Sequence, residues 1–113
     1  MEQEDMVPAR ALYAESLALC QEMGDKINMV CNLSGLAAVV AHATDLSRAA
    51  RLAAAAETLR LSVGVTREPV EGRIYEQAVA SARAGLSEAA FKAAWVEGEQ
   101  MSLNEAISYA LSA

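Results

Sequence analysis

The sequence predicts an all-α protein, an antiparallel helical array of five to six helices. Alanine supplies 25 of the 113 positions, and it combines the highest helix propensity with little bulk, which suits closely packed helices. Only two prolines and six glycines are present, too few for a fold built on many β-turns. With 54% hydrophobic residues, the chain has the composition and size of one folded domain.

The first helix is expected to start near Pro8, because the missing N–H of proline is not needed in a first turn. Gly24 is expected to end it as a C-terminal cap. The residues between them predict an apolar stripe, made of Leu12, Tyr13, Ser16, Leu17 and Leu19.

Two helices follow this first one. Asp25 is placed to cap a helix that runs to about residue 43. Asp45 or Ser47 can open the next helix, which is expected to stop near Gly64.

The clearest break in the chain is residues 64–69, because Glu68 precedes a proline and is biased away from helix. Three helices are expected beyond it. They run from Pro69 to Ala84 with Gly85 at the end, from a Ser87 cap to Gly98, and from a Ser102–Glu105 capping box to about Leu111.

The first and third helices repeat each other at a shift of 40 residues. The shift aligns Ala9 with Ala49, Leu12 with Leu52, Ala14 with Ala54, Leu19 with Leu59 and Gly24 with Gly64. Ala9, Tyr13 and Ser16 give one helical face a small–large–small pattern, which resembles the second helix of a tetratricopeptide repeat. The paired first helix would be residues 26–43, with Thr44 in place of the usual turn glycine.

This resemblance divides the chain into two parts of one domain. Residues 1–64 would be tetratricopeptide-like helices, one half-repeat plus one full repeat, and residues 65–113 would be C-terminal capping helices. The first helix then lacks its own partner, which suggests that the chain begins inside a longer array.

Blocks of residues between 31 and 113 resemble the C-terminal tail of large bacterial signalling ATPases and transcription regulators, including LuxR-type ones. The matching residues are Leu33, Gly35, Leu36 and Ala37; Ala49–Leu52, Ala55–Glu57, Leu59 and Arg60; and Phe91, Ala94, Trp95, Gly98, Ser102, Leu103, Glu105–Ile107, Ala110 and Leu111. The resemblance implies a sensing or coupling segment. It does not imply ATPase or DNA-binding activity, since those belong to family domains that have no counterpart in these residues.

Charge and composition exclude several classes of function. The net charge is −6, and residues 1–25 alone carry −5, so direct nucleic-acid binding is not expected. Residues 27–44 are uncharged but interrupted by polar side chains, which favours a buried helix over a membrane span. Two cysteines and an acidic N-terminus without an apolar core predict a cytoplasmic location.

No catalytic, metal-binding or cofactor-binding residues are predicted, and we expect the chain not to be an enzyme. Cys20, Cys31 and His42 are spaced by 11 residues in turn and form no compact ligand pair. No phosphate-binding loop motif is present in the sequence.

The expected functional surface is a protein-interaction face on the second helix. By resemblance to the inner face of tetratricopeptide arrays, it would comprise Cys31, Ser34, Ala38, Ala41 and His42. These small residues either pack against neighbouring helices, which we favour, or receive an apolar partner. Three aromatic residues are predicted to be structural anchors, namely Tyr13, Phe91 and Trp95.

The sequence therefore predicts a non-catalytic protein-interaction or coupling segment of a bacterial signalling or transcription regulator. Its partners would be upstream domains of the same polypeptide or another protein. The alternative is a standalone helical adaptor or homodimerisation module, in which a second copy covers the open face of the first helix.

Overall fold

The computed structural model describes residues 3–112, with side chains from residue 8 onward. The side chains of Glu2, Glu4 and Asp5, which contribute much of the acidic N-terminal charge, lie outside this described part. Six α-helices and no strands occur within it, which confirms the all-α prediction. They are α1 (Gln3–Met23), α2 (Lys26–His42), α3 (Leu46–Val63), α4 (Pro69–Gly85), α5 (Glu88–Gln100) and α6 (Leu103–Leu111).

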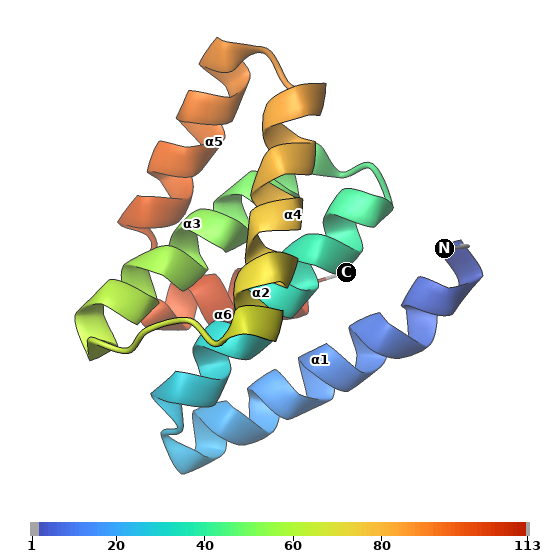
Figure 1. Ribbon diagram of the computed structural model, residues 1–113. Helices are drawn as coiled ribbons and strands as arrows, with labels where there is room; N and C mark the ends of the chain where they lie inside the picture. The colour runs from blue at the N-terminus through green and yellow to red at the C-terminus, as the bar shows by residue number, and fades with distance from the viewer. Residues whose placement is uncertain (1–2, 113) are drawn as a thin grey trace.

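The helices are arranged around α2 and α3, which pack against each other at the centre (Figure 1). Helix α1 runs along the outside of α2, and α5 packs on α3 at the other end of the molecule. Helix α4 lies against both α2 and α3, while α6 lies behind α2 and α3 in this view and contacts α1, α2 and α3. Helix α2 is buried along most of its length, which explains why residues 27–44 carry no charge.

The predicted capping residues occupy their expected places. Asp25, Asp45 and Ser87 each accept a hydrogen bond from a backbone N–H in the first turn of α2, α3 and α5. Ser102 and Glu105 form the predicted capping box of α6. These bonds satisfy N–H groups that the start of a helix leaves without a partner.

Three residues with positive φ end helices. Gly24 and Gly64 have φ of +70° and +83°, as expected for C-terminal glycines, and Thr44 has φ of +67° at the turn after α2. Glycine adopts this conformation without strain, whereas threonine does not. Thr44 therefore stands where a glycine would fit best, as its position in the repeat predicted.

Two predicted helix boundaries are wrong. Helix α1 begins at Gln3 rather than near Pro8, so that the proline lies inside the helix. Proline removes only one backbone hydrogen bond from the helix, a cost that the packing of α1 against α2 offsets. Helix α5 continues to Gln100, because Gly98 packs against α3 and does not act as a cap.

The predicted apolar stripe of the first helix is also partly wrong. Leu17 is buried and Tyr13 packs against the core. Leu12 and Leu19, in contrast, are 67% and 52% exposed. They lie on a different face of the helix from Leu17, because successive residues are about 100° apart around the axis.

Candidate interaction surface

The predicted interaction face on α2 lies against α4. Ser34 is fully buried, and its hydroxyl accepts a hydrogen bond from Arg67 Nη1 at 3.1 Å. Cys31 is exposed and lines a pocket of about 170 Å³ beside the loop that leads into α4. The remaining three residues, Ala38, Ala41 and His42, line a pocket of about 180 Å³ with Gln77, Ala78 and Ser81 of α4.

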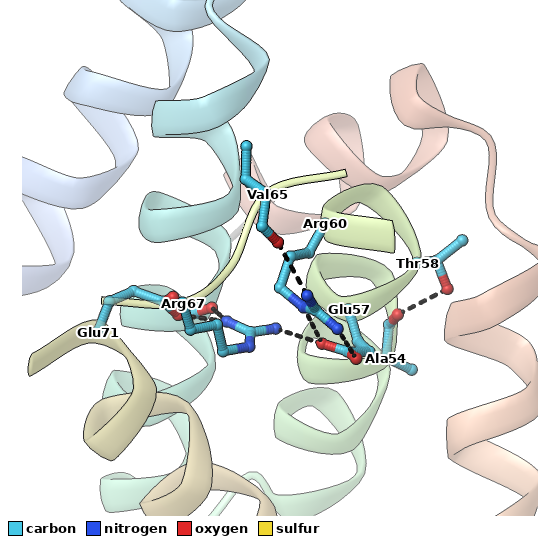
Figure 2. Close-up of polar contacts among 8 residues, drawn as sticks. Ala54, Glu57, Thr58, Arg60, Val65, Arg67 and Glu71 are labelled. Carbon is cyan, nitrogen blue, oxygen red and sulfur yellow. Dashed lines mark hydrogen bonds and ion pairs between the residues drawn. The ribbon is translucent and has the colours of Figure 1, made fainter. Parts of the chain in front are cut away.

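A cluster of four charged side chains fixes the start of α4, and its parts are shown in Figure 2. Glu57 of α3 lies at its centre. The Glu57 carboxylate accepts hydrogen bonds from Arg60 at 2.7 and 2.9 Å and from Arg67 Nη2 at 2.8 Å. Arg60 also donates to the Val65 carbonyl at 2.8 Å, which holds the loop between α3 and α4.

Arg67 connects the loop to three helices. Besides Glu57 on α3 and Ser34 on α2, its guanidinium donates to Glu71 on α4. The guanidinium carbon also lies 3.6 Å from the centre of the Tyr75 ring, in a cation–π contact. A planar, forked cation can satisfy these partners together, whereas a lysine ammonium cannot.

The surroundings of the cluster stabilise the charged form of Glu57 and the neutral form of Tyr75. The hydrogen bonds from Arg60, reinforced by Arg67, lower the pKa of Glu57 to about 2. Burial raises the pKa of Tyr75, so its hydroxyl stays protonated. In the described part of the chain, every buried side-chain nitrogen and oxygen has a hydrogen-bond partner. We conclude that the cluster fastens α4 to α2 and α3.

Sequence reasoning missed this cluster, although its members are spaced for contact along the helices. Glu57 and Arg60 are three residues apart, and Arg67 and Glu71 are four apart, the spacings at which helical side chains meet. The contact of Arg67 with Glu57 depends on the path of the loop between α3 and α4, which brings Arg67 back against α3. The spacing of residues in the sequence does not predict this path.

The three predicted aromatic anchors contact the core to different extents. Tyr13 packs against α2 at Gly35, where an added Cβ would overlap its ring. Phe91 is buried and Trp95 is partly buried, and their rings stack with centres 5.6 Å apart. Arg83 of α4 lies over the Phe91 ring, 4.4 Å from its centre, and so helps to join α4 to α5.

A polar contact ties α1 to α2. The Asn32 amide donates to Ser16 Oγ at 3.0 Å and to Cys20 Sγ at 3.5 Å. Both cysteines are free thiols, and the residues that the structure describes contain no group of histidine, cysteine and carboxylate side chains arranged to hold a metal ion.

An exposed apolar stripe runs along α1. Leu12, Leu19 and Met23 (75% exposed) are separated by seven and four residues, so they share one face of the helix. We call Leu12, Leu19 and Met23 the α1 stripe.

The leucines of the α1 stripe are much more exposed than the leucines at the equivalent positions of α3. At the shift of 40 residues, Leu12 corresponds to Leu52 and Leu19 to Leu59. Leu52 is only 1% exposed, and Leu59 packs against the core. Helix α3 is covered by α2, α4, α5 and α6, whereas the main contact of α1 is with α2, with a smaller one to α6. The α1 stripe therefore lacks the neighbouring helices that cover the same positions in α3.

Within residues 3–112 the structure contains no helix that is both long enough and apolar enough to cross a membrane. No family model, curated protein or solved structure matches the chain.

Proposed function

We propose that this chain is a non-catalytic protein-interaction module in which the α1 stripe receives a helix from a partner. The observation that carries the proposal is the contrast between Leu12 and Leu52, which occupy equivalent positions in α1 and α3 but differ in exposure from 67% to 1%. Exposed apolar residues at helical spacing are typical of surfaces that bind amphipathic helices.

The way the module is built supports a coupling role. The α1 stripe lies on a helix at the outside of the molecule. Helices α2, α3 and α4, in contrast, are held together by the hydrophobic core and by the hydrogen bonds of Arg67. A partner that binds α1 would therefore act on a firmly packed unit. The resemblance to the C-terminal part of bacterial signalling ATPases and transcription regulators supports placing this unit in such a regulator, where tetratricopeptide-like helices would transmit an upstream event.

Hydrogen exchange tests this proposal. The exchange of α1 backbone amides is measured in the isolated chain and in the native assembly purified from the source cells. We expect slower exchange for residues 12–23 in the assembly, because a docked partner suppresses local opening. Exchange in the centre of α3, which is already buried, is expected to change little. Equal exchange of α1 in both samples would contradict the proposal.

Light scattering over a concentration series separates this proposal from the homodimer alternative. The proposed module is expected to be monomeric alone, because its partner is another protein segment. A dimer that Leu19→Ser abolishes would instead assign the α1 stripe to self-association.

A further inference from the structure

The chemistry of the partner of the α1 stripe can be inferred by comparing α1 with the equivalent face of α3, which other helices cover. Ala55, Leu59 and Ser62 of α3 line a pocket of about 140 Å³ together with Met101, in the turn before α6, and with Leu103 and Ala106 of α6. On this face of α3 a leucine thus lies between two small residues, and the start of α6 forms the other side of the pocket.

The equivalent face of α1 differs in charge. At the shift of 40 residues, Ala55, Leu59 and Ser62 correspond to Glu15, Leu19 and Glu22. Both glutamates are exposed, as is the leucine between them. Glu15 and Glu22 are seven residues apart and therefore form one acidic edge beside the apolar stripe. The two helices end alike, at glycines with positive φ, so the register of this comparison is fixed from the helix ends.

From this difference we infer that the partner is a basic amphipathic helix, with apolar residues that pack on Leu12, Leu19 and Met23 and with Lys or Arg residues that face Glu15 and Glu22. The inference rests on the proposed function and names the chemistry of its partner. Opposite charges at the edge of an apolar contact fix its register and exclude partners of like charge.

The same charges argue against a second copy that docks through its α1 or its α6 end. Two α1 helices packed on each other would bring together segments that each carry −5 over residues 1–25. A copy that used the α6 end would offer residues 99–112, which contain Glu99 and Glu105 and no lysine or arginine. Like charges brought this close destabilise an interface.

The experiment uses three synthetic helical peptides with the same leucine stripe, flanked by lysine, glutamine or glutamate. Their binding to the full chain is measured by fluorescence anisotropy at low and high salt. We expect the lysine peptide to bind about fivefold more tightly than the glutamine peptide, as for two solvent-exposed ion pairs. High salt should reduce this advantage, because such pairs are screened.

Two variants connect the charge preference to the acidic edge. The double variant Glu15→Gln with Glu22→Gln should bind the lysine and glutamine peptides equally, whereas Glu76→Gln on α4 should leave the preference intact. Leu19→Ser should weaken all three peptides, and its exposed position means that the variant should still fold.

The outcomes distinguish the inference from the proposed function. Equal binding of the three peptides would overturn the basic partner and leave the α1 stripe as an interface. Tighter binding of the glutamate peptide, or no binding of any peptide, would also overturn the inference. In each of these cases the hydrogen exchange of residues 12–23 in the native assembly tests separately whether α1 is an interface.

Discussion

The ring of Tyr13 on α1 occupies the space that the absent side chain of Gly35 leaves on α2. A Cβ built on Gly35 would overlap three ring carbons of Tyr13. The pair brings the two helices close together, and it places α1 so that one face meets α2 while the α1 stripe stays exposed.

Gly35→Ala should therefore destabilise the fold although alanine is the better helix former. We expect a loss of about 1–3 kcal/mol in the free energy of unfolding, the range for overpacked cores, measured by urea denaturation. Gly72→Ala on α4 is a matched control, since its Cβ would lie 3.7 Å from the nearest atom. That variant should gain about 0.5 kcal/mol. Equal effects of the two substitutions would show that Tyr13 does not constrain α2.

Arg67→Ala should loosen α4. The substitution leaves Glu57 and Glu71 without their shared cation, and removing one partner of these partly buried ion pairs should cost roughly 2 kcal/mol, between the values for exposed and for buried pairs. Hydrogen exchange should become faster in α4 than in α5, because Arg67 fastens α4 to α2 and α3. Arg67→Lys should restore less than half of the loss, since lysine lacks the fork. Arg73→Ala, at an exposed position of α4, is the control. Full recovery with lysine would contradict the assigned geometry.

Stability should depend on pH through Glu57. Its pKa of about 2 in the folded chain lies below the ordinary value of 4.5. A lowered folded-state pKa gives stability that is complete above the unfolded value and is lost as the pH falls from about 4.5 to 2. After allowance for screening at this partly exposed group, the contribution is roughly 2 kcal/mol.

The check is to compare the pH dependence of unfolding for the native chain and Glu57→Gln. The variant should be less stable at neutral pH, and the difference should shrink towards pH 2. Glu76→Gln, at an exposed position, should behave as the native chain does. A constant difference between Glu57→Gln and the native chain over this range would exclude the linkage.

Phe91 should contribute more to stability than Trp95. Phe91 is buried among core residues, while Trp95 is only partly buried. Phe91→Ala is expected to cost about 3 kcal/mol, and Trp95→Ala clearly less. Urea unfolding followed by circular dichroism measures both losses without the tryptophan signal. A greater loss for Trp95→Ala would reverse these roles.

The N-terminal caps of the helices could be predicted because they depend on neighbouring residues. Asp25, Asp45 and Ser102 act within one helical turn, and their spacing is visible in the sequence. Gly98, in contrast, could not be interpreted from its neighbours in the sequence. The absence of a side chain at this position allows α5 to approach the α3 backbone at Arg51, so the glycine reflects a tertiary contact rather than a helix end.

The interaction surface could be predicted only in part. A leucine at helical spacing looks the same whether a neighbour covers it or not, so the sequence places Leu12 and Leu19 in one apolar stripe with Leu17. The structure buries Leu17 and exposes the other two, unlike their equivalents Leu52 and Leu59 in α3. The link between Arg67 and Glu57 was likewise hidden, because it depends on the path of the loop.

Our proposal requires that a partner covers the α1 stripe in the cell. Site-specific photo-crosslinking tests it most directly, with the reactive residue at position 19 or, as a control, at position 61, where Leu61 is also exposed. We predict one reproducible protein adduct from position 19, lost when Met23→Glu is added, and little adduct from position 61. Equal crosslinking from both positions would contradict the claim.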